Sequence, residues 1–355
     1  VLPDDVMEAV TTDTARAGLA LDGGLAAFLS ERLEALRPEY DVLGPTSPAV
    51  DDARDLERIG ISWRAPSGRP TRGPERVDNL WAKTQRLSLH PDDRSLRLRL
   101  SFGREVAEDA SRDQARHRLV TELASRLLPE AAALHADPEL TGLLGEWIGG
   151  RPLLTQAIAY WNAPGGGALF HHDAFDEPTN GRQRGVLYAQ LTGSTAWLAL
   201  SIEDLARRVH EFAELLAEGT FPWVREGLFQ SDAAFDAFLR VARDPAASVR
   251  ALGQPGGGVL GSIVDQGPEF TSLLADAGHG YVVAEGDVIL LPNHGLARTC
   301  MHSVFCAGEE TAFSLSLAIR DGQWPGKGSR RARSRRARGR RRGRGRPGSS
   351  RGLRR

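Results

Sequence analysis

The chain has 355 residues, a mass of 38.5 kDa and 41% hydrophobic residues, so it can bury a sizeable core and is not disordered throughout. No apolar run reaches the length of a membrane-spanning helix, and the acidic first residues argue against a secretory signal. With only Cys300 and Cys306, a disulfide scaffold is excluded and a reducing cytoplasm is the expected location.

The formal net charge of −1 hides a division of charge along the chain. Residues 321–355 hold Lys327 and fourteen arginines against Asp321 alone, which gives them +14 and leaves −15 for residues 1–320. We expect a disordered, Arg-rich tail there, because it has little apolar surface to bury. A solvated extension is favoured over a nucleic-acid contact, since the tail lacks interleaved aromatics that stack on bases. The preceding body has one lysine, Lys83, so a buried anion must be met by arginine, by Lys83 or by neutral donors.

Residues 1–150 are expected to form a mostly helical region that packs on the domain that follows. Leucines recur at helical spacing over 25–36 and again over 119–127, which predicts two helices with one apolar face each. The segment 66–74 is rich in Gly, Pro, Ser and Arg and is typical of a loop. Leucine and arginine alternate strictly over 96–100, which predicts a half-buried strand.

Residues 151–320 have a different pattern, with short β-type runs interrupted by a helical insertion at about 202–250. The insertion carries apolar residues at helical spacing, and helices do not alternate with the β-type runs. The pattern therefore favours an α+β protein with a sandwich or small barrel as its core, and it fits a βαβ nucleotide fold poorly. The eight runs cover 156–162, 168–172, 185–191, 196–201, 281–284, 287–291, 300–306 and 312–320.

A metal site is predicted from two histidines and a carboxylate. Residues i and i+2 of a strand point to the same side, so His171 and Asp173 project together. With His302 from the strand-like run 300–306, they would form a facial triad of two histidines and one carboxylate, which leaves three positions open on an iron(II) ion. His294 is the alternative third ligand; His302 is preferred because His294 lies in an Asn-His-Gly turn.

Four further motifs accompany the His-x-Asp pair in chain order. They are the Pro164-Gly165 turn, the Gln-Leu-Thr-Gly segment 190–193 followed by Trp197, the Gly-Asp segment 286–292, and the Ser-Leu-Ser-Leu strand 314–317. This ordered set, over about 157–320 without the insertion, resembles the JmjC-type, cupin-like 2-oxoglutarate oxygenases, most closely their bacterial ribosomal-oxygenase branch. The resemblance implies a double-stranded β-helix (jelly-roll or cupin) core at 151–320, with the helical N-terminal region and the insertion added to it. It also implies that His171, Asp173 and His302 are the iron ligands.

The resemblance further implies Fe(2+) as the metal and 2-oxoglutarate as the cosubstrate. Family members often have a lysine or arginine two residues before the tryptophan, where this chain has Thr195. We expect Arg320, at the end of the last strand and on the face of Ser316, to pair with the distal carboxylate of 2-oxoglutarate instead. Hydroxyl groups of Tyr188 and Thr195 are expected at the same carboxylate, and Ser316 is expected to belong to the same cosubstrate site. Weaker cation candidates are Arg182, Arg184 and Arg298.

The implied activity is that of a dioxygenase that hydroxylates an unactivated C–H bond with O2 and releases succinate and CO2. Asp173 fills the position that halogenases of this superfamily leave for chloride, so hydroxylation is expected. The substrate is left open among a peptide or protein side chain, an amino acid and another small natural product, and no membrane partner is expected. The helical parts are expected to shape the pocket and are candidates for a homodimer contact. Two different functions also fit the sequence: a cupin-like metal- or small-molecule-binding protein without redox turnover, and a nucleic-acid-associated protein acting through its basic tail.

Overall fold

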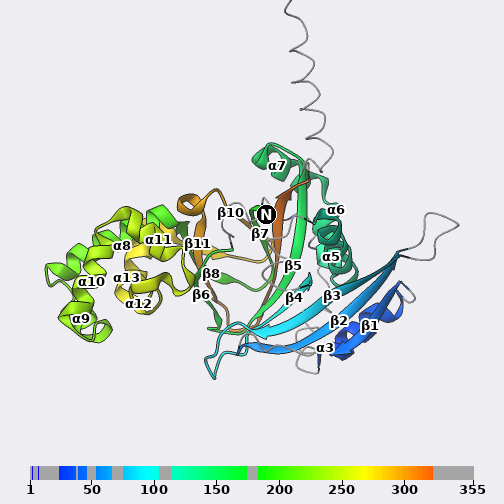
Figure 1. Ribbon diagram of the computed structural model, residues 1–355, viewed down its shortest axis with the longest axis horizontal. Coiled ribbons are helices and arrows are strands. Elements are labelled where there is room, and N and C mark those ends of the chain that lie inside the picture. Colours follow the sequence, from blue (N-terminus) through cyan, green and yellow to red (C-terminus); the bar gives the residue numbers. More distant parts are fainter. Residues whose placement is uncertain are drawn as a thin grey trace, which may run out of the picture.

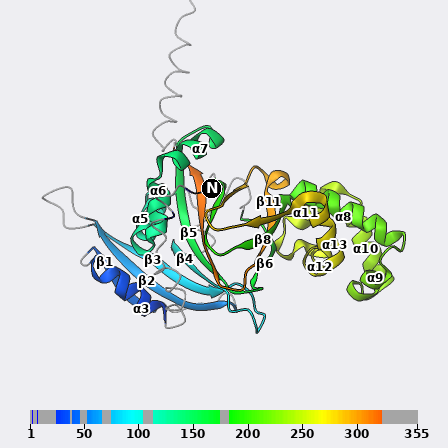
Figure 2. The same cartoon turned by 180° about the vertical axis from the view of Figure 1, so that it is seen from behind.

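Two antiparallel sheets face each other and carry helices on their outer sides (Figures 1 and 2). The computed structural model describes Leu2, Met7 and residues 24–36, 39–45, 53–65, 75–103, 113–173 and 183–322. Within these ranges the large sheet has the order β1 (Tyr40–Pro45), β2 (Asp55–Ala65), β3 (Glu75–Arg86), β4 (Leu96–Phe102), β5 (Pro152–Asn162), β12 (Ala312–Asp321), β7 (Gln183–Thr192) and β10 (Val288–Pro292). The small sheet has the order β6 (Gly167–His171), β11 (Cys300–Cys306), β8 (Thr195–Ser201) and β9 (Gly280–Val283).

The β-type runs expected after residue 151 all form strands, and they supply the facing parts of both sheets. The chain is thus a mixed α and β protein with antiparallel sheets, as the sequence predicted. Both cysteines are buried without a disulfide. The helices within the described ranges are too short or too polar to span a bilayer. The basic tail lies outside the described residues from 323 onward.

The main hydrophobic core lies between the large sheet and the N-terminal helices. Leu96, Leu98 and Leu100 are buried there, because alternation turns all three side chains of β4 to one face. Two of the helices coincide with the leucine-spaced segments of the sequence, and Figure 1 shows α5 and α6 against the outer face of β5. The helices are α3 (Leu25–Glu34), α5 (Gln114–Leu127), α6 (Pro129–Ala136) and α7 (Pro138–Ile148).

Residues 1–150 contain more strand than was expected of a mostly helical region. Three strands, β1 to β3, precede the one that the sequence predicted. Strands that bury only one face alternate between apolar and polar residues. In β2 and β3 both faces are buried, since Ile59 and Leu80 enter the core while Ser62 and Lys83 on the other face are also inaccessible. Polar and apolar residues therefore mix, and the period-two signal is lost.

The insertion forms a separate helical layer behind the small sheet, at the opposite end of the molecule from α3 (Figure 1). It extends beyond the expected limit of about 250, and the π-helical turn Ala275–His279 leads from it into β9. Its own core contains Phe212 and Phe270, and Phe170 and Met301 join it from the outer face of the small sheet. The helices are α8 (Ile202–Ala217), α9 (Pro222–Leu228), α10 (Asp232–Ala242), α11 (Pro245–Leu252), α12 (Gly261–Gln266) and α13 (Pro268–Leu274).

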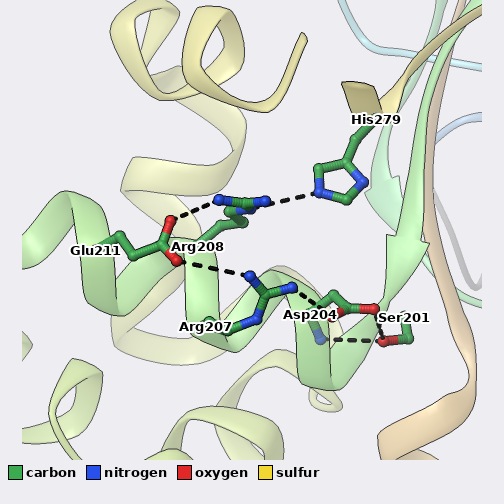
Figure 3. A network of polar contacts seen from close by, with 6 residues as sticks. All are labelled: Ser201, Asp204, Arg207, Arg208, Glu211 and His279. Atoms are coloured by element: carbon green, nitrogen blue, oxygen red, sulfur yellow. Dashed lines mark hydrogen bonds and ion pairs between the residues drawn. The ribbon is translucent and has the colours of Figure 1, made fainter. Parts of the chain in front are cut away.

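A polar network ties the start of α8 to the turn before β9 (Figure 3). Ser201 caps the helix, because its Oγ accepts a hydrogen bond from the Asp204 amide at 3.0 Å and donates one to Asp204 Oδ2 at 2.7 Å. Arg208 donates to Glu211 at 2.8 Å and to His279 Nε2 at 3.4 Å. The small sheet and the insertion thereby share one set of polar contacts.

Loss of this cap should lower the stability of the chain measurably. We expect Ser201→Ala to reduce the free energy of unfolding by about 1 kcal/mol, because the Asp204 amide loses its acceptor. Ser201→Thr keeps a hydroxyl cap and should lose only a few tenths of that amount. Urea denaturation of the three proteins measures the difference. Equal loss in both variants would show that the hydroxyl group does not act as a cap.

Candidate metal centre

Strand pairing in the small sheet brings the predicted metal ligands together. β6 and β11 are antiparallel neighbours, and His171 lies directly opposite His302 in their register. The two imidazole centroids are 4.3 Å apart, and His302 Nε2 lies 3.8 Å from Asp173 Oδ2. Ligand atoms of all three residues lie within 4.8 Å of one another. After small side-chain movements, one ion with bonds of roughly 2.1 Å could be held by all three.

The protonation and orientation of these side chains suit a metal. The Leu169 carbonyl lies 2.8 Å from His171 Nδ1 and can only accept, so Nδ1 donates a proton to it and Nε2 is the nitrogen left to face a metal. Burial, helped by the nearby His171, lowers the pKa of His302 to about 3, so this imidazole is neutral. Burial raises the pKa of Asp173, but the nearby histidines, His302 foremost, lower it more, so its pKa lies below the ordinary value and the carboxylate is ionised. Neutral imidazole and ionised carboxylate are the forms that bind metal.

The buried His302 makes the stability of the metal-free chain depend on pH. In the unfolded chain a histidine takes up a proton below about pH 6.5, whereas in the folded chain the pKa of His302 is about 3. The unfolded state therefore binds more protons in this window, and the free energy of unfolding falls as pH falls, by at most about 1.4 kcal/mol per pH unit. Urea denaturation from about pH 7 to about pH 5.5, where ordinary carboxyl groups stay ionised, should show a steeper loss for the wild type than for His302→Asn. Parallel profiles would contradict the buried neutral state.

A cavity of about 550 Å³ opens between the two sheets beside the three ligands. Trp197 forms part of its wall and stacks on His302, with ring centroids 5.4 Å apart and planes 24° apart. The indole Nε1 of Trp197 donates to Thr195 Oγ1 at 2.8 Å, and Thr195 in turn donates to Gln190 Oε1 at 2.8 Å. Tyr188 donates to the same Gln190 oxygen at 3.1 Å. This chain of hydrogen bonds fixes the wall against which His302 rests.

The residues expected at 2-oxoglutarate divide into two groups in the structure. Tyr188 and Ser316 line the cavity. Thr195 is fully buried within the hydrogen-bond chain and is not among the lining residues. Arg320 is also absent from the lining: it is 3% exposed, and its Nε donates to Thr155 Oγ1 at 3.1 Å. The reason is length, because four residues of strand place Arg320 about 13 Å along β12 from Ser316.

His294 and the weaker arginine candidates do not join the three ligands. His294 is exposed in the turn after β10 and does not belong to the described cluster of metal-binding groups. Arg298 lines a separate cavity beside β9 and β10. Arg184 is not among the described residues that line the central cavity, and Arg182 lies outside the described residues.

Sequence reasoning missed both arginines that line the cavity, Arg54 and Arg97. Alternation over 96–100 correctly put the arginines on the face opposite the leucines, but nothing in the pattern showed what covers that face. In the structure it faces the cavity between the sheets, and Arg97 Nε donates to Gln85 Oε1 at 2.8 Å. Its charge is one of the influences that lower the pKa of Asp173, after the three histidines.

Comparison with known proteins gives only distant similarities. No protein-family model matches the chain, and no curated protein matches it. Solved structures that are similar to it include the Escherichia coli ribosomal oxygenase YcfD, at 14% identity and a TM-score of 0.27 over 82% of this chain and 50% of that chain. A YcfD structure with cobalt and 2-oxoglutarate is 12% identical, with a TM-score of 0.25 over 89% of this chain and 57% of that one. The chain thus spans about half the length of these proteins. TM-scores this low do not establish a shared fold or shared residues.

Proposed function

We propose that the chain is an iron(II)- and 2-oxoglutarate-dependent oxygenase. The observation that carries this proposal is the cluster of His171, Asp173 and His302 at the wall of a cavity of about 550 Å³. Two imidazoles and one carboxylate on the same side of an ion leave its remaining positions for other ligands, which is the donor set of non-haem iron oxygenases. The cavity is within the usual size range of small-molecule sites, roughly 300–1,000 Å³.

The strand order supports a double-stranded β-helix around this cluster. From β5 to β8 successive strands alternate between the large and the small sheet, and from β9 to β12 they alternate again. The large sheet pairs β5, β12, β7 and β10, and the small sheet pairs β6, β11, β8 and β9. We infer that these two four-stranded sets wind as a jelly roll, with the metal ligands at the end where β6 and β11 meet.

The residues present fit the metal on chemical grounds. The site offers a neutral buried imidazole from His302, the Nε2 atom of His171, whose Nδ1 is held by a carbonyl, and the ionised carboxylate of Asp173, which are donors that Fe(II) accepts. When bound, iron and 2-oxoglutarate supply the activation of O2, and 2-oxoglutarate is converted to succinate and CO2. The side chains of the cavity hold and orient these groups, and Tyr188 and Trp197, each under 5% exposed, exclude water from them.

The reaction that we propose is hydroxylation of an unactivated C–H bond. Its substrate would contact two exposed apolar side chains of the cavity lining, Leu89 and Leu169, and the half-buried carboxylate of Asp265, which lines the same cavity. Exposed apolar groups beside a charged one suit a peptide side chain, an amino acid or another small natural product better than a large nucleic acid surface.

Succinate formation tests the proposal. The protein reconstituted with Fe(II) and given 2-oxoglutarate and O2 should release succinate slowly when the substrate to be hydroxylated is absent. It should release succinate faster when that substrate is present. The same chain without metal should release none. A chain that binds the metal but neither binds 2-oxoglutarate nor forms succinate would instead be the non-redox cupin-like binding protein, and the oxygenase proposal would fail.

A further inference from the structure

We propose that Arg97 binds the distal carboxylate of 2-oxoglutarate; this inference rests on the function proposed above. A 2-oxoacid that chelates the metal through its keto acid end leaves its second carboxylate inside the cavity. A buried carboxylate needs a cation or several donors, since an isolated charge away from water is costly. An arginine meets this need with two parallel hydrogen bonds.

The cavity offers few cations for this role. Among the described lining residues, the cationic side chains are Arg54 and Arg97. Arg97 lies on β4, opposite Tyr160 of β5, whereas Arg54 precedes β2, two strands further from β5. Neighbouring strands are about 4.8 Å apart. The backbone of Arg54 therefore lies roughly 10 Å further from β5 than the backbone of Arg97 does. Position in the sheet therefore favours Arg97.

A buried chain of polar groups holds Arg97 in place. Its Nε donates to Gln85 Oε1 at 2.8 Å, and the Gln85 amide donates to Asp55 Oδ1. Lys83 Nζ lies 3.1 Å from the same Asp55 oxygen, and Lys83 and Gln85 are only 3% and 2% exposed. This series of hydrogen bonds fixes the plane of the Arg97 guanidinium before a ligand binds, which reduces the conformational entropy lost on binding. Lys83, the single lysine of residues 1–320, pairs with Asp55 in this network and is therefore not the cation that we assign to the ligand.

A second observation points to a ligand at the same place. Asn162 is 1% exposed and lines the cavity, yet its Oδ1 has no hydrogen-bond partner among the described residues. It lies two residues after Tyr160 on β5 and so shares the face that Arg97 adjoins. An unsatisfied buried amide is unfavourable. Because the amide can turn over and present its NH2 group, a carboxylate between Arg97 and Asn162 would satisfy both side chains.

Two ligands that differ only at the distal end test this assignment. 2-Oxoglutarate and pyruvate share the keto acid end, but pyruvate lacks the second carboxylate. With the Co(II)-loaded full chain, we expect Arg97→Met to weaken 2-oxoglutarate binding about 10- to 100-fold. Affinity for pyruvate should stay within about twofold, because pyruvate does not contact Arg97 in this assignment, and affinity for Co(II) should not fall, because the substitution removes a positive charge near Asp173. Arg97→Lys keeps the charge and loses the paired hydrogen bonds, so it should fall between the wild type and Arg97→Met.

Arg54→Met serves as the matched control, because it removes the other cation of the cavity and should leave the preference for 2-oxoglutarate over pyruvate unchanged. Calorimetric titration measures all of these affinities. If the preference persists in Arg97→Met and Arg97→Lys, the assignment of Arg97 is wrong while the oxygenase proposal stands. If the wild-type chain with Co(II) binds neither acid, the oxygenase proposal itself fails, and this inference fails with it.

Discussion

Asp173→Ala is expected to weaken the binding of a divalent metal by more than about 100-fold and to abolish succinate formation. Loss of an outer contact to a metal ligand already costs about 10- to 100-fold in affinity, and this substitution removes a ligand itself. It also removes the one negative charge of the cluster, leaving His171 and His302 to face a cation without a carboxylate. The side chain of Asp173 is 36% exposed, so the fold should tolerate the change.

Equilibrium dialysis with Co(II), followed by a turnover assay with Fe(II), measures both effects. Asp265→Asn is the matched control, because Asp265 is a second carboxylate that lines the same cavity but does not belong to the cluster. This variant should bind Co(II) as the wild type does. Full metal affinity in Asp173→Ala, or an equal loss in both variants, would contradict the assignment of the ligands.

Gly167→Ala is expected to damage the metal centre without touching a ligand. A Cβ at this position would lie 2.0 Å from the Val304 carbonyl oxygen and 2.7 Å from the Phe305 Cα, both on β11. The clashing atoms belong to the backbone and cannot relieve the clash by a change of rotamer, so β6 and β11 would have to move apart. The pairing of these strands is also what places His171 opposite His302. We expect a loss of about 3 kcal/mol in the free energy of unfolding, the upper end of the usual overpacking cost, and a metal affinity lowered about tenfold.

Urea denaturation and Co(II) titration of the same protein measure the two losses. Gly142→Ala in α7 is the control, because a Cβ there meets nothing within 4 Å and its backbone is helical. It should raise the stability by about 0.5–1 kcal/mol, since alanine has less freedom to lose on folding. A Gly167→Ala protein with unchanged metal affinity would show that the β6–β11 spacing does not position the ligands.

The strands after residue 151 could be predicted from sequence because each is short, apolar and bounded by turn residues. The strands before it could not. β2 and β3 bury both faces, one in the main core and one toward the cavity side, so apolar and polar residues do not alternate. The insertion was expected to end near residue 250, and the glycine-rich segment 253–258 follows that limit. The structure continues with α12 and α13 after that segment.

The closeness of His171, Asp173 and His302 was predictable because it depends on local geometry. His171 ends β6, Asp173 follows it by two residues, and His302 had only to lie on a strand that pairs with β6. Which side chains reach the cavity proposed for the cosubstrate depends on distance along and across strands, and alternation does not give that distance. Arg320 has the correct parity with Ser316 but lies too far along β12, whereas Arg97 reaches the cavity from a strand outside the recognisable motifs.

The proposed oxygenase requires one ion that is shared between the chain and 2-oxoglutarate. The most direct measurement is the affinity of the anaerobic full chain for 2-oxoglutarate with and without Co(II). Chelation predicts that the metal strengthens 2-oxoglutarate binding at least about tenfold, and that 2-oxoglutarate strengthens metal binding by the same factor. Equal affinity for 2-oxoglutarate with and without bound Co(II) would contradict a shared ion.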